Sequence, residues 1–359
     1  MNRIWQRGLC LFIFVFLCVV SEYEVFGQKS NTEIVAFYNL ENFFDTIDTR
    51  GVNDTEFTPE GKKKWDTEKY WTKVDHISKV IASLGIEHNS DGAVVMGLCE
   101  MENRGVLDDL VDAAAIKKRG YQIIHYDSPD QRGIDVALLY RPEVFNVENT
   151  SSHSLIIRDE DGDQIFTRDQ LLVTGLLNGD RIHFIVNHWP SRYGGEESSR
   201  PFRNEAARLS RALVDSIMGT DSHAKIIIMG DLNDDPNNES VRIHLNAHSE
   251  RSDLKKDELF NATGVLFDEG KGTLPYRGSW NLFDQIIFSK SFLKAKIGAY
   301  YFDSVHIYKP EFLLQQEGKY KGYTWRTYVG NNYHGGFSDH LPSYIILKRK
   351  RFFNGFRLF

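Results

Sequence analysis

The chain has 359 residues, of which 41% are hydrophobic and 26% are charged, and its net charge is −7. Such a composition can form a large buried core, and the length fits one large domain or two ordinary ones. The weak acidic balance neither indicates nor excludes a polyanionic substrate, because affinity for nucleic acid depends on local lysines, arginines and metal ions.

The N-terminus has the layout of a secretory signal. Arg3 and Arg7 precede an uncharged apolar stretch over residues 8–20, and residues 25–27 suit a cleavage before Gln28. The apolar stretch is short for a membrane span, so an uncleaved anchor is the weaker alternative. The sequence therefore predicts a secreted or periplasmic protein.

Removal of a signal peptide over residues 1–27 leaves a mature chain, residues 28–359, that contains one cysteine, Cys99. This chain can form no internal disulfide, so its hydrophobic core must stabilise it. The mature sequence contains no internal repeat, low-complexity linker or second hydrophobic span. We expect a single domain with no stable protein partner and no transmembrane span.

Apolar runs that predict β-strands alternate with segments of helical periodicity along the mature chain. Several runs are almost continuously apolar, which is typical of strands covered on both faces. The expected strands cover residues 33–40, 92–99, 121–126, 134–142, 171–177, 181–189, 225–233, 282–289 and 343–348. The expected helices cover residues 66–84, 104–119 and 204–219. This mixture predicts an α/β sandwich rather than a helix bundle or an all-β domain.

Polar residues suited to metal binding or proton transfer stand where several of these strands end. Ligands bind at such places in open α/β folds, where strand ends meet loops. One such residue alone would be an ordinary cap or turn, but their recurrence favours a shared site. They are Asn39, Glu100, His188, Asp231 and Asn233, together with Asp339 and His340 just before the last strand.

The motif GDLNDDP offers hard oxygen ligands. If the strand stays extended, Asp231 and Asn233 point to the same side. Carboxylate and amide oxygens suit Mg²⁺ or Mn²⁺. A solvated turn would explain this motif by itself, and we expect Asp234 and Asp235 to be solvated turn residues. Glu100 favours the metal site, because it supplies a second anionic ligand from another strand end.

Two histidines stand in settings that suit catalysis. His188 and His340 can each take up a proton, and the cationic ring can stabilise charge on a phosphate. Either role needs a carboxylate that holds the ring. Asp284 is the candidate partner of His340, and Asp135 is the weaker candidate for His188. We expect the other histidines to be surface or packing residues.

In chain order, these motifs resemble those of the endonuclease/exonuclease/phosphatase superfamily, which has the deoxyribonuclease I-like fold. The resemblance runs from FYNLEN through GLCEMEN, RGIDVALLYRP, NHWPSR, GDLND and LFDQIIFS to FSDHLP, and so covers nearly the whole mature chain. The ordered set is specific, although each piece alone is weak. The resemblance implies a four-layer α/β sandwich, in which helices flank two mixed β-sheets. It also implies hydrolysis of a phosphate ester with a divalent metal ion.

The resemblance further implies roles for the acids and amides. Asn39, Glu100 and Asp339 resemble residues of the metal site, where Asp339 would be a metal or water ligand. Asp231 and Asn233 resemble the pair that orients the attacking water and the phosphate.

Four other residues match the family pattern. His340 with Asp284 resembles the transition-state stabiliser or acid–base pair, and His188 stands where the deoxyribonuclease branch has its second active-site histidine. Arg168 resembles a phosphate-contacting arginine of that branch. Gln285 departs from the pattern, because several branches have arginine there.

The segments NHWPSRYGGEESSRPFRNEAARL and GTLPYRGSWNLFDQI look most like those of secreted bacterial nucleases. The sequence therefore predicts a phosphodiesterase that uses Mg²⁺ or Mn²⁺ and takes DNA or RNA as its substrate. Arg192, Arg200 and Arg203 are candidates for contacts with the phosphate backbone, or else belong to an ordinary solvated surface. The alternatives are a phosphomonoesterase or a lipid or inositol phosphate hydrolase on the same scaffold. A catalytically inactive binding module is less well supported, because the set of acids and histidines is complete.

Overall fold

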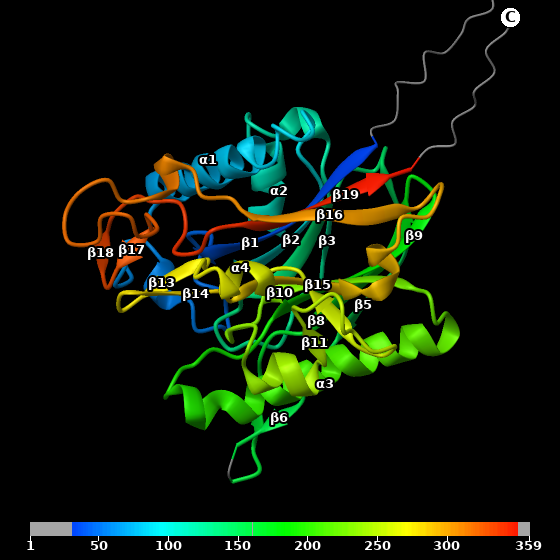
Figure 1. Cartoon of the computed structure of the whole chain (residues 1–359). Helices are drawn as coiled ribbons and strands as arrows, with labels where there is room; N and C mark the ends of the chain where they lie inside the picture. The colour runs from blue at the N-terminus through cyan, green and yellow to red at the C-terminus, as the bar shows by residue number, and fades with distance from the viewer. Residues whose placement is uncertain (1–30, 160, 351–359) are drawn as a thin grey trace, which may run out of the picture. The chain divides into compact units, whose positions relative to one another are not determined.

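Two β-sheets, packed face to face, form the centre of the computed structural model, which describes residues 31–159 and 161–350 (Figure 1). In spatial order, the first sheet contains β16 (Tyr300–Ile307), β19 (Ser343–Arg349), β1 (Thr32–Phe43), β2 (Ala93–Met101), β4 (Asp135–Tyr140) and β3 (Gln122–His125). The second contains β11 (Ala247–His248), β12 (Leu259–Asn261), β15 (Asp284–Ser289), β10 (Lys225–Asp231), β9 (Asp180–His188), β8 (Gln170–Leu177) and β5 (Phe145–His153). Each sheet has a central parallel pair, β1 with β2 and β9 with β10, flanked by antiparallel neighbours. At the edge of the second sheet, β11 and β12 are also parallel.

Helices cover the two outer faces of this pair of sheets (Figure 1). α1 (Thr67–Ser83) and α2 (Arg104–Asp112) pack on the first sheet, and α3 (Glu196–Thr220) packs on the second. The side chains of Asp66 and Asn103 cap the first two helices, because each accepts a hydrogen bond from a backbone N–H of the first turn.

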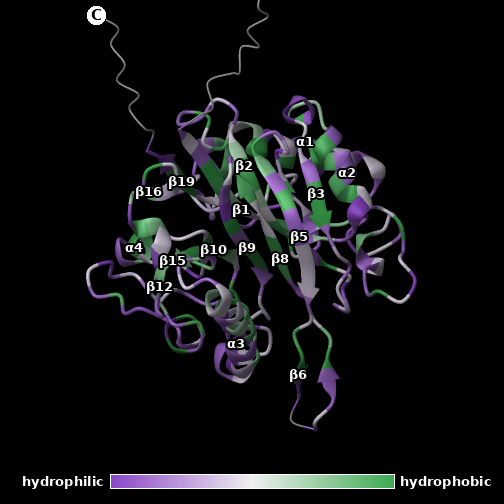
Figure 2. Ribbon diagram, turned by 90° about the vertical axis from the view of Figure 1, so that its right-hand side faces the viewer, coloured by the Kyte–Doolittle hydropathy of each residue, from purple (hydrophilic) through white to green (hydrophobic). Residues whose placement is uncertain are grey.

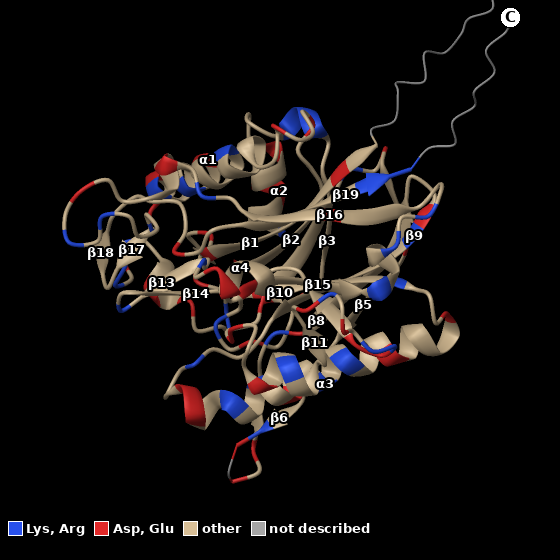
Figure 3. Ribbon diagram, viewed as in Figure 1, with Lys and Arg blue, Asp and Glu red and all other residues tan. Residues whose placement is uncertain are grey.

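Alternation of side chains along the central strands produces the layers. On β10, Ile227 and Met229 lie in the core between the sheets, whereas Ile226 and Ile228 pack toward α3. Hydrophobic residues are therefore concentrated in the strands (Figure 2), while both signs of charge are interspersed along α3 (Figure 3). The predicted four-layer α/β sandwich is confirmed.

Two helix boundaries differ from the prediction. α2 ends at Asp112, and the chain continues through a turn and a short 3₁₀ segment (Lys117–Arg119) rather than one long helix. α3 begins at Glu196 and runs through Pro201, although a proline lowers helix propensity. Periodicity alone located the apolar face of each helix but not its ends.

The strand predictions missed the short strands β11 and β12 and two longer strands, β5 and β16. β5 and β16 each stand at the edge of a sheet, where one side of the strand has no neighbouring strand in that sheet. Their side chains are mostly polar or only partly buried, so they lack the continuous apolar run of a central strand.

Short elements surround the sandwich. They are the hairpins β6 (Ile157–Arg158) with β7 (Gln164–Ile165), β13 (Leu274–Tyr276) with β14 (Ser279–Asn281) and β17 (Tyr328–Val329) with β18 (Asn332–Tyr333), and helix α4 (Gly264–Asp268). The predicted signal peptide lies outside the described residues. Among those that are described, no helix has both the length and the apolar character to cross a membrane.

Candidate active site

Strand register places three polar residues side by side in the second sheet. Asp231, the last residue of β10, is paired with His188 of β9 on one side and with Asp284 of β15 on the other. In the first sheet, Asn39 on β1 is paired with Cys99, so Glu100 follows directly on β2. The ends of these strands meet at one edge of the sandwich.

Asn39 joins the two sheets at this edge. Its amide Nδ2 donates to Oε1 of Glu100 over 3.2 Å and to Oδ2 of Asp231 over 3.0 Å. Asn39 has no solvent exposure and Asp231 only 2%, whereas Glu100 is partly exposed. A buried amide thus holds two carboxylates close together, and Glu100 is the one that solvent can reach.

The backbone around the site adopts an unusual conformation. Glu100 and Asn233 have φ values of 62° and 51°, and Glu41 and Asn42 both have 51°. Left-handed φ is costly for a residue with a Cβ, and such strain is typical of functional sites. Here the strained turns point backbone N–H groups at carboxylates: Asn42 donates to Glu100 over 2.9 Å, and Asn233 donates to Asp231 over 2.9 Å.

His340 and Asp284 lie in direct contact. Nδ1 of His340 is 2.7 Å from Oδ2 of Asp284, and Nε2 of the same ring is 3.8 Å from Oδ2 of Asp231. Burial lowers the pKa of His340, but the carboxylates of Asp284 and Asp231 outweigh it and hold the pKa well above its usual value. The ring is therefore a cation that faces the centre of the site.

His188 has the opposite electrostatic setting. Its Nε2 lies 3.8 Å from both Glu100 and Asp231. Burial, followed by the charge of Arg168, lowers its pKa well below the usual value, so its ring is neutral. The expected partner Asp135 contacts His125 instead, over 2.9 Å. Among the described residues, Nδ1 of His188 has no hydrogen-bond partner.

Asp231 lies between these two rings. Burial raises its pKa to about 7, and the negative charges of Asp284 and Glu100 act in the same direction, whereas His340 and the N–H of Asn233 oppose them. A carboxyl group with a pKa near neutrality can both accept and release a proton. The side-chain amide of Asn233 donates to the backbone carbonyl of Trp189 over 3.0 Å, which fixes its orientation.

The donor set fits a divalent cation. One ligand atom from each of Glu100, His188 and Asp231 lies within 4.8 Å of the others. Carboxylate oxygens are the preferred ligands of Mg²⁺ and Mn²⁺, and a cation there would relieve the repulsion between Glu100 and Asp231. The roles of Asn39 and Glu100 at a metal ion stay a prediction.

Asp339, the third predicted metal residue, is paired with a cation of the protein. Nη2 of Arg326 donates to Oδ2 of Asp339 over 2.6 Å, and Nε of the same guanidinium donates to Glu41 over 3.2 Å. Lys73, which is buried like Glu41, lies 4.0 Å from the carboxylate of Glu41. Burial raises the pKa of Asp339, but Arg326, His340 and Lys73 outweigh it and the pKa is lowered.

Sequence analysis did not assign roles to Glu41, Lys73 and Arg326. The spacing of Glu41, two residues after Asn39 on the same strand, was an available signal, because such residues share a face. Arg326 and Lys73 carried no comparable signal, since they come from a loop and a helix far away in the chain.

Two of the arginines predicted to contact phosphate, Arg168 and Arg192, bond to the protein itself. Arg168 is buried and donates to the backbone carbonyls of His188 and Trp189 and to Asp130. It therefore positions the segment that carries His188, and its contact with phosphate stays a prediction. Arg192 donates to the carbonyl of Asn233 over 2.9 Å.

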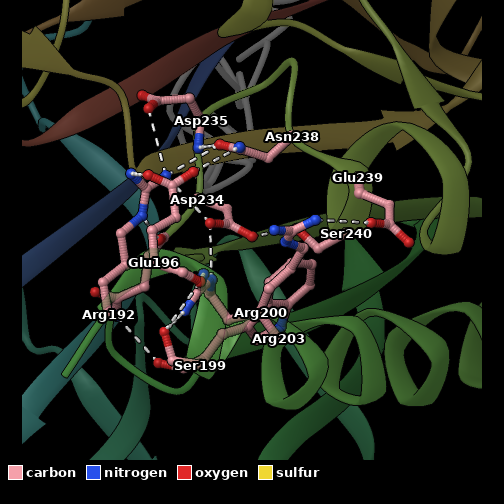
Figure 4. Close-up of polar contacts among 12 residues, drawn as sticks. Arg192, Glu196, Ser199, Arg200, Arg203, Asp234, Asp235, Asn238, Glu239 and Ser240 are labelled. Atoms are coloured by element: carbon pink, nitrogen blue, oxygen red, sulfur yellow. Dashed lines mark hydrogen bonds and ion pairs between the residues drawn. The ribbon is translucent and has the colours of Figure 1, made fainter. Parts of the chain in front are cut away.

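The expectation of a solvated turn at Asp234 and Asp235 was wrong. Both side chains are buried, and both lie close to Arg192, at 3.1 Å and 3.5 Å (Figure 4). Asp235 also accepts a hydrogen bond from the backbone of Leu282 over 2.7 Å. These carboxylates tolerate each other because arginine charges and backbone donors compensate them. Arg200 pairs with Glu197 and Glu239 in the same region.

Comparison with known proteins identifies one family whose profile matches the sequence and several solved structures with the same fold. The sequence profile of the Endonuclease/Exonuclease/phosphatase family matches residues 34–349. A search of curated proteins found no match. Humanized D. rerio TDP2 is 12% identical with a TM-score of 0.52, and the match covers 89% of this chain and 100% of that chain.

Two further solved structures are similar to the same degree. D. rerio TDP2 complexed with single-strand DNA product is 13% identical with a TM-score of 0.51, over 89% of this chain and 100% of that chain. The Bacteroides thetaiotaomicron mannosyl-6-phosphatase is 16% identical with a TM-score of 0.50, over 88% of this chain and 99% of that chain. At these identities, the likeness shows the fold alone.

Proposed function

The chain belongs to the endonuclease/exonuclease/phosphatase family, whose members hydrolyse phosphoric esters, and we propose that it is a secreted, divalent-metal-dependent nuclease. The observation that carries the proposal is the meeting of Asp231, Glu100 and the His340–Asp284 pair at one edge of the sandwich. Secretion rests on the signal-like residues 1–27.

The side chains have complementary tasks in this proposal. Asp231, oriented by the backbone of Asn233, accepts a proton from the attacking water. The cationic ring of His340 donates to an oxygen of the phosphate as negative charge builds, and Asp284 stabilises that cation. A divalent ion held by Glu100 would supply charge stabilisation at the phosphate and the leaving oxygen, and Asn39, whose Nδ2 donates to Glu100 and Asp231, would orient the two carboxylates beside it.

Between nucleic acid and a small phosphate ester, we propose nucleic acid as the substrate. A protein of the same fold, D. rerio TDP2, has been crystallised with a single-strand DNA product. Hydrolysis of a phosphate monoester is the second candidate function, because an equally similar structure is that of a mannosyl-6-phosphatase. The same fold therefore supports both chemistries in these two proteins.

A substrate panel tests the proposal. The purified protein is incubated with single-stranded DNA, plasmid DNA, RNA, inositol phosphates and mannose 6-phosphate, each with Mg²⁺, Mn²⁺, Ca²⁺ or EDTA. We expect cleavage of nucleic acid with Mg²⁺ or Mn²⁺ and none with EDTA. Release of phosphate from mannose 6-phosphate without cleavage of any nucleic acid would refute the nuclease proposal and support a phosphomonoesterase.

Matched variants test the site itself. Asp231→Asn should abolish turnover, whereas His183→Gln should retain it, because His183 lies on the same strand as His188 but bonds to Thr174 on β8 rather than to a residue of the site. Near-normal hydrolysis by Asp231→Asn would refute the assignment of this site.

A further inference from the structure

A cleft of about 500 Å³ opens beside the catalytic residues. Its two walls are the β13–β14 hairpin and the loop over residues 315–326. Six of its lining residues are aromatic or basic, and they come from the hairpin and from the loop. The lining includes Tyr276, Arg277, Lys319, Tyr320, Arg326 and Asp339.

The inner end of this cleft is part of the candidate active site. Arg326 and Thr324 both line the cleft, and both bond to Asp339: Nη2 of Arg326 to its carboxylate over 2.6 Å, and Oγ1 of Thr324 to its carbonyl over 2.9 Å. The next residue in the chain is His340. A group bound in the cleft would therefore stand directly next to the phosphate under attack.

Exposed aromatic rings form the outer part of the cleft. Tyr276 and Tyr320 are 57% and 41% exposed. Each has a neighbouring cation: the guanidinium of Arg277 lies 5.2 Å from the ring centre of Tyr276, and Nζ of Lys319 lies 5.4 Å from that of Tyr320. A flat π-surface beside a cation suits a ligand that combines a planar ring with an anion.

Tyr323 connects the two walls and so fixes the width of the cleft. Its hydroxyl accepts a hydrogen bond from the backbone N–H of Gly278 over 2.7 Å. Its ring centre lies 5.8 Å from that of Tyr320 and 6.4 Å from that of Trp280. A cleft whose walls are already joined loses little conformational freedom when a ligand binds.

Backbone strain at the hairpin tip is a second, independent observation. Arg277 has a φ of 48° and Gly278 a φ of 91°. A two-residue hairpin loop with both φ values positive favours asparagine or aspartate before the glycine, so arginine is a costly choice at this position. A contact between the guanidinium of Arg277 and a ligand in the cleft would explain why arginine occupies this strained position.

We propose that this cleft binds the nucleobase adjacent to the scissile phosphate of a single-stranded nucleic acid. Tyr320 and Tyr276 stack on the base, while Arg277 and Lys319 contact the neighbouring phosphate. A sugar phosphate has no aromatic face to offer these rings, whereas every base has one. The inference rests on the proposed nuclease function and names the part of the substrate that gives affinity.

Binding measurements test this subsite apart from catalysis. Fluorescence anisotropy gives the Kd of an Asp231→Asn protein for a single-stranded oligonucleotide and for the same strand with abasic residues. We expect Tyr320→Ala or Tyr276→Ala, added to that protein, to weaken binding of the intact strand about tenfold. Binding of the abasic strand should change much less, and Tyr320→Phe should restore affinity for the intact strand.

Trp71→Ala is the matched control, because Trp71 is 49% exposed on α1 and does not line the cleft. It should leave both Kd values unchanged. Equal losses for intact and abasic strands, or no loss at all, would overturn the base subsite even if the protein cleaves nucleic acid. If the wild-type protein instead fails to cleave or bind nucleic acid, and the tyrosine variants raise the KM for mannose 6-phosphate, both the nuclease proposal and its base subsite fail.

Discussion

The guanidinium of Arg203 is wholly buried and lies 2.7 Å from the carboxylate of Asp234, measured from Nε to Oδ1. Oγ of Ser240 donates a hydrogen bond to the other oxygen of this carboxylate, Oδ2, over 2.7 Å. Arg203 comes from α3, and Asp234 follows Asn233 in the chain (Figure 4). This ion pair therefore connects the long helix to the loop that carries Asn233.

Loss of Arg203 should destabilise the fold. Arg203→Met leaves Asp234 buried without its closest cation, which costs about 3–5 kcal/mol. Urea denaturation measures the loss, and the double variant Arg203→Met/Asp234→Asn should regain part of it, because the uncompensated charge is gone. Arg208→Met is the control, since Arg208 pairs with Glu205 on the surface of the same helix. A double variant no more stable than Arg203→Met would argue against the pair.

Asp284→Asn should impair catalysis without loss of the fold. The neutral amide no longer stabilises the cation of His340, so the pKa of that ring falls toward neutrality. We expect kcat to decrease about 10²- to 10⁴-fold while KM changes little. Asp135→Asn removes the carboxylate of a comparable pair, His125 with Asp135, and should retain kcat. Comparable kcat values for the two variants would contradict the assigned role of Asp284.

The site residues at strand ends could be predicted from sequence motifs, because the register of neighbouring strands places such residues next to one another. Asp231, His188 and Asp284 are adjacent for this reason. Contacts between distant segments were not predictable in this way. Glu41 and Arg326 are 285 residues apart, and Arg326 stands in a loop without periodicity.

The solvent exposure of Asp234 was also predicted wrongly, because local composition was the only basis for that prediction. Acidic residues before a proline are typical of a solvated turn. Asp234 is buried instead, because α3 extends farther toward its N-terminus than periodicity indicated and brings Arg203 against it. A local pattern does not contain that tertiary information.

Glu33 should make stability depend on pH. Burial raises its pKa from 4.5 to about 7, although the charge of Arg141 and the hydroxyl of Tyr300 oppose the shift. The folded state thus binds this proton more tightly than the unfolded state, so stability falls as the pH rises from about 4.5 to 7. Glu33→Gln should therefore increase the free energy of unfolding by up to about 3 kcal/mol at pH 8.

Below pH 4.5, the same substitution should have little effect, because Glu33 is then protonated in both states. Denaturant titrations at pH 4 and pH 8 provide the comparison. Glu60→Gln is the control, since Glu60 is exposed, and it should change stability little at either pH. A gain from Glu33→Gln that is equal at both pH values would exclude protonation as its cause.

Glu100→Gln should weaken the binding of a divalent ion before it affects the fold. Glu100 is the partly exposed carboxylate next to Asp231, and an amide in its place supplies no negative charge. A ligand that binds only the folded state raises the melting temperature, and the rise depends on the ratio of its concentration to Kd. Mn²⁺ should therefore raise the Tm of the wild-type protein more than that of Glu100→Gln.

Glu102→Gln is the matched control, because Glu102 lies two residues farther on and bonds to Asp45 and Thr49. An equal Mn²⁺-dependent rise in all three proteins would place the cation elsewhere.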